Sequence, residues 1–252
     1  MKTLENKTAI ITGAGSGMGK AMAILFACEG ANVIVSDLKT ERVDAVVKEI
    51  ISAGGKATGV AVNVSKEEEV KKMIDTAMNT YDGLDILVNN AGVMDDFIPV
   101  ADVSNELWNK VIGVNLNGPF YTCRLAVPLM LKRGKGVIIN ISSIGGLNGA
   151  RAGAAYTASK HALIGLTKNI GYMYGTKGIR CNAIAPGGVT TNIMEGANPN
   201  AFGYERMSGG FATNIRMAEP NEIAELALYL ASDKSSFVNG TVIVADGGWT
   251  AY

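Results

Sequence analysis

Short runs of apolar, β-favouring residues alternate along the chain with stretches whose apolar residues recur at helical spacing. Most of these runs are continuously apolar, as strands buried on both faces are. The predicted strands are Thr8 to Thr12, Asn32 to Ser36, Ala57 to Val62, Leu84 to Val88, Gly136 to Ile141, Arg180 to Ala185 and Thr241 to Ala245. Strand followed by helix, about seven times over, predicts an α/β fold with a doubly wound parallel sheet and helices on both faces.

No linker, charge block or repeat divides the chain. Residues 1–252 are therefore predicted to form one Rossmann-type domain. The longest irregular stretch runs from Thr190 to Met217 and is rich in Gly, Asn and Met. It is a candidate lid at about 190–217 over a binding site, with a flexible surface insertion as the alternative.

Charge and cysteine content narrow the range of possible binding partners and metal sites. Lys plus Arg equals Asp plus Glu at 23 each, which argues against nucleic acid and an anionic membrane surface as partners. No apolar run approaches the roughly 18 residues that a membrane span needs, so we expect a cytoplasmic protein. Cys28, Cys123 and Cys181 lie far apart with a single histidine in the chain, and we expect reduced core thiols and no metal site.

A glycine-rich turn follows the first strand, from Thr12 to Gly19. Such a turn lets the backbone approach phosphates closely, and a helix N-terminus offers them unpaired N–H groups. The strict G-x-G-x-x-G spacing fails because Met18 and Lys20 occupy the places of its last glycine, and a P-loop fails at Ala14 and Ala21. The turn predicts a nucleotide pyrophosphate site beside a helix that begins near Lys20, with a purely structural turn as the alternative.

Asp37 closes the second strand, eighteen residues after Gly19. An acidic residue at about this distance meets the adenosine ribose and repels a 2′-phosphate. Neither Ser16 nor Leu38 supplies a cation for such a phosphate, although Lys39 could reach one. These residues favour NAD over NADP. The alternative is that Asp37 is a turn residue or the N-cap of a helix.

Tyr156 and Lys160 stand four apart in a segment with helical spacing, which places them on one face. A free tyrosine has a pKa near 10, and a nearby ammonium could lower it by up to about three units. Ser143 follows a predicted strand, at the edge of the sheet where open α/β folds bind ligands. The three residues predict an acid/base centre with a hydroxyl beside it. His161 directly follows Lys160 but points elsewhere on a helix, and we expect a packing or surface role.

The order and spacing of these motifs resemble the short-chain dehydrogenase/reductase family over essentially the whole chain. Ser143 lies thirteen residues before Tyr156, the interval found in that family. The matching segments are Thr12-Gly13-x-x-x-Gly17-x-Gly19, Asn89-Asn90-Ala91-Gly92, Asn115 within Val114 to Gly118, Asn140 to Ser143, Tyr156-x-x-x-Lys160 and Pro186 to Thr191. One departure is Asn63, which stands where many members have aspartate near the adenine.

The resemblance implies a catalytic set with separate roles. Tyr156 would give its proton to a carbonyl oxygen while the nicotinamide delivers hydride, and Ser143 would hold that oxygen. Lys160 would lower the tyrosine pKa and bond the nicotinamide ribose, and Asn115 would support proton exchange with solvent. The implied cofactor contacts are Gly13, Ser16, Gly17, Met18, Gly19, Asp37, Asn63, Val64, Asn90, Ala91, Gly92, Tyr156, Lys160, Pro186, Val189 and Thr191.

The substrate is expected to be a small carbonyl or alcohol compound with apolar character, because the expected pocket walls are mainly apolar. These walls are Met94, Ile144, Leu147, Asn148, Gly188, Met194, Phe202 and Tyr204. A 3-oxoacyl-carrier-protein reductase, a hydroxysteroid dehydrogenase and a sugar (glucose) dehydrogenase share the motifs and remain open. A non-catalytic nucleotide-binding regulator is the alternative from another class. The family is commonly tetrameric, and Ala101 to Leu131 and Ala154 to Tyr174 carry apolar residues on more than one face, as an interface would.

Overall fold

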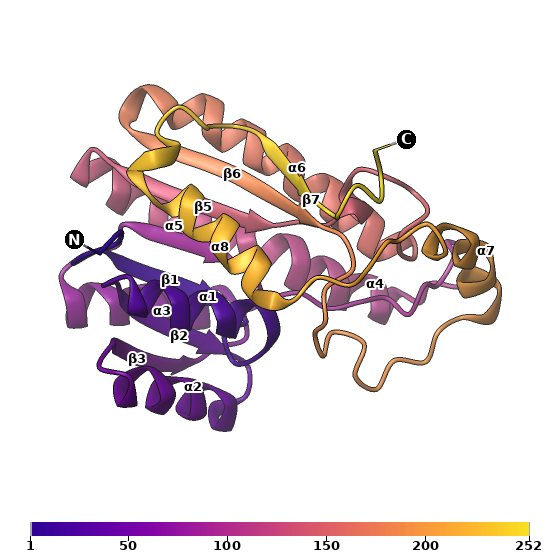
Figure 1. Cartoon of the computed structure of the whole chain (residues 1–252), viewed down its shortest axis with the longest axis horizontal. Coiled ribbons are helices and arrows are strands. Elements are labelled where there is room, and N and C mark those ends of the chain that lie inside the picture. Colours follow the sequence, from indigo (N-terminus) through magenta and orange to yellow (C-terminus); the bar gives the residue numbers. More distant parts are fainter. Residues whose placement is uncertain (1, 252) are drawn as a thin grey trace.

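The strands form one parallel sheet. A computed structural model describes residues 2–251 and orders the seven strands β3-β2-β1-β4-β5-β6-β7 (Figure 1). They are β1 (Thr8–Thr12), β2 (Asn32–Asp37), β3 (Lys56–Ala61), β4 (Ile86–Asn89), β5 (Gly136–Ile141), β6 (Ile179–Pro186) and β7 (Val242–Ala245). The predicted doubly wound sheet is confirmed, and no predicted strand end is misplaced by more than two residues.

Helices cover both faces of this sheet. They are α1 (Gly17–Cys28), α2 (Thr40–Ser52), α3 (Glu67–Tyr81), α4 (Asn105–Ile112), α5 (Gly118–Arg133), α6 (Ala154–Tyr174), α7 (Ala201–Phe211) and α8 (Pro220–Ala231). One core layer joins the sheet to α1, α2 and α8, and the other joins it to α3, α5 and α6. In β1, Ala9 and Ile11 face the first layer and Ile10 the second. Burial on both sides explains why the strands are continuously apolar.

The strand order opens a crevice at one edge of the sheet. After β1 the chain moves outward to β2 and β3 and then returns to β4 on the other side of β1. Ligands of open α/β sheets bind outside the carboxyl ends of the strands at such a reversal. In Figure 1, α7 stands beyond the end of the sheet toward which the strand arrows point. The fold therefore brings the ends of the neighbouring strands β1, β4 and β5 together at the edge of the sheet on whose side α7 lies.

The segment predicted to be irregular between Thr190 and Met217 is helical at its centre. α7 occupies Ala201–Phe211, and the Asn200 side chain begins it by accepting the Gly203 N–H at 2.9 Å. Both ends of the segment meet at one place, where Val189 pairs with Ala218 in a short parallel bridge. The prediction of an irregular stretch was therefore wrong for these eleven residues.

One cysteine differs from expectation. Cys123 and Cys181 are buried as predicted, but Cys28 is exposed at the end of α1 and is not a core residue. Among residues 2–251, no group of three or more His, Cys, Asp or Glu side chains is placed to hold a metal ion. No helix in the same range is long and apolar enough to cross a membrane.

Candidate active site

The glycine-rich turn passes straight from β1 into α1. The helix begins at Gly17, three residues earlier than the predicted start near Lys20. Gly13 has a φ of 62°, which favours glycine, and a Cβ on Gly19 would collide with the Gly13 carbonyl. Ser16 occupies the N-cap position, and its hydroxyl makes no capping bond. The first-turn N–H groups and this hydroxyl suit an anionic phosphate.

Thr12 and Asn90 fasten this turn to the end of β4. The Thr12 hydroxyl oxygen accepts the backbone N–H groups of Asn90 at 3.0 Å and Ala91 at 3.1 Å. The Asn90 side chain donates to the carbonyls of Thr12 at 2.9 Å and Gly13 at 3.1 Å. The NH₂ group of the Asn90 side chain is thus committed to the protein itself. The hydrogen bonds of Thr12 were not foreseen, although it begins the motif that resembles the family, because their partners lie 78 and 79 residues away in the sequence.

A cleft of about 660 Å³ opens beside the turn. It is lined by Gly15, Ser16, Gly17, Lys20, Ala21, Ile24, Thr190, Thr191, Asn192, Pro220 and Asn221. Thr191 lies directly against the turn, since a Cβ on Gly17 would be 3.1 Å from its methyl group. Pro186 ends β6, and Val189 stands between it and Thr191. The structure therefore brings the predicted contacts after β1 and after β6 together, whereas Met18 packs against the hydrophobic core.

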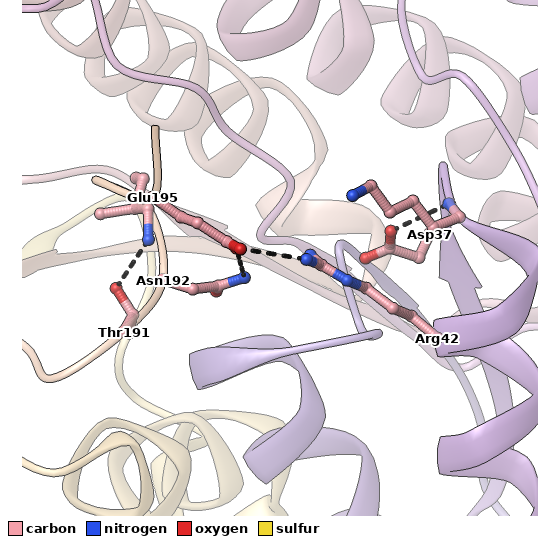
Figure 2. Close-up of polar contacts among 7 residues, drawn as sticks. Asp37, Arg42, Thr191, Asn192 and Glu195 are labelled. Atoms are coloured by element: carbon pink, nitrogen blue, oxygen red, sulfur yellow. Dashed lines mark hydrogen bonds and ion pairs between the residues drawn. The ribbon is translucent and has the colours of Figure 1, made fainter. Parts of the chain in front are cut away.

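Asp37 lies beside Gly15 and Arg42 at the far end of the turn. Its carboxylate accepts the N–H groups of Gly15 at 3.0 Å and Lys39 at 3.2 Å, so it does act as a turn residue. A Cβ on Gly15 would lie 2.7 Å from the Arg42 Cβ and 2.8 Å from the Asp37 carboxylate, so the stem of this unforeseen arginine lies close to the turn. In Figure 2 the Glu195 carboxylate faces the Arg42 guanidinium, at 3.4 Å. The N-cap of α2 is Lys39, so the alternative of Asp37 as that N-cap is wrong.

Asn63 and Val64 lie in the connection between β3 and α3. The Asn63 side-chain oxygen accepts both the N–H and the hydroxyl of Ser65, at 3.0 Å and 2.7 Å. Only its NH₂ group is left for an adenine. Val64 is 7% exposed, and it lies close enough to Gly118 that a Cβ there would be 3.0 Å from its methyl group.

Tyr156 and Lys160 lie in the first and second turns of α6, on the face that packs toward β5. Both are buried, at 7% and 3% exposure, and the Lys160 ammonium is 5.5 Å from the centroid of the tyrosine ring. Lys160 Nζ also donates to the Ile141 carbonyl at 2.8 Å. Ser143 accepts the Gly145 N–H at 3.0 Å, and a Cβ on Gly145 would lie within 3.5 Å of both the Ser143 hydroxyl and the tyrosine ring. The predicted acid/base centre is therefore assembled in one place.

Burial dominates the electrostatics of this centre. It raises the pKa of Tyr156 to about 12, although a hydrogen bond with Ser143 acts in the opposite direction. Burial also lowers the pKa of Lys160 to about 8. The expected lowering of the tyrosine pKa by Lys160 is not found in this structure. The reason is physical: removal of the phenolate from water costs more than the neighbouring groups return.

Asn115 lies in a π-helical turn, Gly113–Asn117, between α4 and α5. π-helical turns often occur at functional sites. Its side chain accepts the Val93 N–H at 2.9 Å and donates to the Val93 carbonyl at 3.0 Å and to Ser159 at 3.2 Å. A Cβ on Gly92 would lie 3.5 Å from the Asn115 oxygen and 3.6 Å from Lys160 Nζ. Asn115 is thus adjacent to the lysine, as expected for a residue that supports it.

An aromatic cluster attaches α7 to the rest of the site. The Phe97 ring lies 5.8 Å from Tyr204 and 6.0 Å from Phe211, and Phe211 lies 6.2 Å from Trp249. Trp249 Nε1 also donates to the Gly210 carbonyl at 2.7 Å. Only Tyr204 was among the predicted pocket walls. The other three come from separate parts of the chain, and nothing in their local sequence links them.

The remaining predicted walls differ in accessibility. Ile144 is buried, whereas Leu147, Met194 and Phe202 are exposed. Met94, Asn148 and Gly188 are half-buried. His161 is exposed, and its ring nitrogen lies 2.9 Å from the Thr157 carbonyl, which agrees with the surface role expected for it.

Comparisons with known proteins extend these observations. A family model described as enoyl-(acyl carrier protein) reductase matches residues 13–250. The 3β-hydroxysteroid dehydrogenase 2 of Eggerthella lenta is 44% identical over 251 residues, covering 99% of this chain and 96% of the relative. The cyclohexanol dehydrogenase of Acinetobacter sp. (strain SE19) is 39% identical, covering 98% of this chain and 96% of the relative.

A solved structure also has a closely similar fold. It is a putative NAD(P)-dependent gluconate 5-dehydrogenase from Beutenbergia cavernae with bound NADP at low occupancy. The TM-score is 0.89 at 35% identity, and 99% of both chains is covered. Because the similarity of sequence and of structure runs from one end to the other, the chain belongs to the short-chain dehydrogenase/reductase family, NAD(P)-dependent oxidoreductases that act on CH–OH or carbonyl groups.

Proposed function

We propose that this enzyme interconverts an apolar secondary alcohol and its ketone with NAD(H), using Tyr156 as the acid/base. The observation that carries the proposal is the convergence of half-buried Ser143 with buried Tyr156 and Lys160 next to Gly145 and Ile141. The aromatic cluster around α7 supports an apolar substrate. The names of the steroid and cyclohexanol relatives point to the same class.

The roles of the residues follow from their contacts. A bound nicotinamide would supply or take up the hydride. The Ser143 hydroxyl is positioned to hold the substrate oxygen, and the adjacent phenol of Tyr156 gives that oxygen a proton during reduction. Lys160 contributes positive charge beside the phenol. Asn115 keeps the Val93 backbone in place beside Gly92 and donates to Ser159, one residue before the lysine.

The preference for NAD(H) rests on Asp37. Its carboxylate stands at the end of β2, where it would accept bonds from ribose hydroxyls and repel a 2′-phosphate. Arg42 and Lys39 are the nearby cations that could counter this repulsion, but the Arg42 guanidinium faces Glu195. Together these contacts favour NAD(H), the cofactor without a 2′-phosphate.

We expect a cytoplasmic homotetramer that contacts neither nucleic acid nor membrane. Large apolar side chains remain exposed on the helices that were predicted to pack against a second copy. They are Trp108 on α4, Phe120 and Leu131 on α5, and Tyr172 and Met173 on α6. The segment from Thr190 to Met217 is proposed to act as a lid, because it adjoins both the cleft and the aromatic cluster.

The experiment is a turnover assay of purified protein with NADH and NADPH against cyclic ketones, ketosteroids, β-ketoesters and an acyl thioester, and with the alcohols and glucose in reverse. Turnover of cyclic ketones with NADH is expected. Preference for the acyl thioester would favour a 3-oxoacyl-carrier-protein reductase instead, and preference for glucose would favour a sugar dehydrogenase.

Tyr156→Phe provides the matched control for that assay. It removes only the hydroxyl, so turnover should fall by about a thousandfold or more while NADH binding changes little. Binding is followed by the fluorescence of the reduced cofactor. Activity close to that of the wild type in this variant would refute the acid/base role.

A further inference from the structure

Glu195 lies in the segment from Thr190 to Met217, and its carboxylate contacts a helix on the far side of the glycine-rich turn. Its oxygen Oε2 accepts a hydrogen bond from Arg42 Nη2 at 3.4 Å, which is also an ion pair between residues 153 apart in the sequence. The Asn192 side chain donates to the same oxygen, also at 3.4 Å. Figure 2 shows both groups pointing toward this carboxylate. The segment proposed as a lid is therefore tied to the first turn of α2.

A tight turn of the backbone holds Glu195 near the phosphate end of the site. The Glu195 N–H donates to the Asn192 carbonyl at 3.0 Å. The residues just before this turn lie against the glycine-rich turn, since a Cβ on Gly17 would be 3.1 Å from the Thr191 methyl carbon and 3.8 Å from the Asn192 side-chain oxygen. The place of the Glu195 carboxylate is thus set by the same residues that line the cleft.

Arg42 lies at the ribose end of the glycine-rich turn. Its Cβ and the Asp37 carboxylate approach the same face of Gly15, so the arginine begins beside the acid that is expected to meet the adenosine ribose. Arginine can bind a phosphate through two parallel N–H donors. Lys39 is fully exposed to solvent, where water and salt screen its charge. Arg42 is therefore the cation on which recognition of a 2′-phosphate would chiefly depend.

The ion pair limits what Arg42 can bind. The Arg42 side chain is 30% exposed and that of Glu195 is 68% exposed, so the pair is weak enough for a ligand to displace. A 2′-phosphate would nevertheless have to compete with the carboxylate for the guanidinium and to approach a second negative charge besides Asp37. The ribose hydroxyls of NAD(H) need no cation and meet no such competition.

We propose that Glu195 is a positioning residue that sets cofactor specificity, because it holds the Arg42 guanidinium away from a 2′-phosphate and so disfavours NADP(H) relative to NAD(H). The segment next to the substrate then takes part in the choice of cofactor. The inference rests on the proposed function in one respect, since it places the cofactor along the glycine-rich turn. It depends neither on the substrate nor on which cofactor the wild type prefers.

The test measures the dissociation constants of NADH and NADPH by the fluorescence of the reduced cofactors and takes their ratio. Effects on the diphosphate cancel in this ratio, because both cofactors carry it. Glu195→Gln removes the charge and keeps the length of the side chain. Glu205→Gln is the matched control, because Glu205 lies exposed on α7 in the same segment and forms no ion pair within residues 2–251.

Glu195→Gln should tighten NADPH relative to NADH by about threefold to fivefold, the effect of one exposed ion pair, and Glu205→Gln should leave the ratio unchanged. In an Arg42→Met background, Glu195→Gln should change the ratio by about twofold or less, because its partner is gone. An unchanged ratio in Glu195→Gln, or the same change with and without Arg42, would overturn the proposal. Equal changes in both dissociation constants would also overturn it, since the pair would then only fasten the segment.

Adenosine 2′,5′-bisphosphate and AMP provide a second pair of probes, which differ only in the 2′-phosphate. Their ratio, measured by calorimetry, should shift in the same direction in Glu195→Gln, and the absence of a shift would contradict the role assigned to Arg42. Failure of the proposed function gives a different result. A wild type that prefers NADPH, or that turns over no ketone, would contradict the proposed function, while a shifted ratio in Glu195→Gln would still support the role of Glu195.

Discussion

Lys160 is a charged side chain kept in the interior of the protein, and its burial has a cost. Its pKa is lowered to about 8, because the ammonium is separated from water. Below about pH 8 the lysine is charged in both the folded and the unfolded chain, so the full free-energy cost of burying its charge lowers the stability of the folded protein. Between this value and the ordinary 10.5 the folded protein binds fewer protons than the unfolded chain, so its free energy of unfolding rises with pH.

Lys160→Met should therefore make the protein more stable while it removes activity. The free energy of unfolding at pH 7 should rise by about 1–2 kcal/mol, since relief of the buried charge is partly offset by the unpaired Ile141 carbonyl. Urea denaturation at pH 7 and pH 10 measures this. The gain should shrink at the higher pH, and a gain of equal size at both would contradict the electrostatic explanation.

Asp37 is the residue on which cofactor choice is expected to depend. Asp37→Asn keeps an acceptor for the Gly15 N–H and removes the negative charge. NADPH binding should tighten by about tenfold relative to NADH, equivalent to about 1.4 kcal/mol. Fluorescence titration with both reduced cofactors measures the ratio, and Asp44→Asn on the exposed side of α2 is the control. Parallel changes for both cofactors would mean that Asp37 serves only the turn.

The residues of the proposed catalytic cluster were predictable because helical periodicity and family spacing fix their positions. Tyr156 and Lys160 share a face, and the chain length between Ser143 and Tyr156 returns them to the same sheet edge. The Asp95 carboxylate accepts the Tyr156 N–H at the start of α6 at 2.8 Å. This contact was not predictable, since sixty-one residues separate the two partners. The direction of the tyrosine pKa was also missed, because burial depends on all the elements around the ring.

Among the elements, the strands were predictable and α7 was not. A strand buried on both faces leaves a continuous apolar run that is visible locally. α7 has three glycines in its eleven residues, which disfavour a helix. Contacts with Phe97 and Trp249, which are distant in sequence, stabilise it instead. Local sequence therefore could not reveal this element.

Trp249→Phe tests this view of α7. The change keeps an aromatic ring near Phe211 and removes the hydrogen bonds from Nε1 to Gly210 and Thr213. The KM for the organic substrate should rise by about tenfold with kcat changed by about threefold or less, because a looser helix weakens binding more than chemistry. Proteolysis within residues 190–217 should also become faster. Trp108→Phe, at the other tryptophan, should change neither measurement.

For the molecule as a whole, the proposed tetramer requires faces that meet another copy, and α5 offers one candidate. Phe120 on α5 is 42% exposed, and the Arg124 guanidinium lies 4.7 Å from its ring centroid. A charge at this position would have to be buried if α5 packs against its counterpart. Phe120→Asp should therefore reduce the mass measured by light scattering from that of the proposed tetramer to that of a dimer or monomer. An unchanged tetramer would place the interface elsewhere.

The short bridge between Val189 and Ala218 separates two parts of the protein that can change independently. The chain leaves the sheet after β6 and returns at nearly the same point, with the Thr190 N–H donating to the Ala218 carbonyl at 2.8 Å. Insertions, deletions or exchanges between these two points need not disturb the seven strands or the glycine-rich turn, provided that Thr190, Thr191 and Asn192, which line the cleft, are kept. Evolution can thus supply new substrate specificities as interchangeable loops on an unaltered catalytic frame, and protein engineers could do the same.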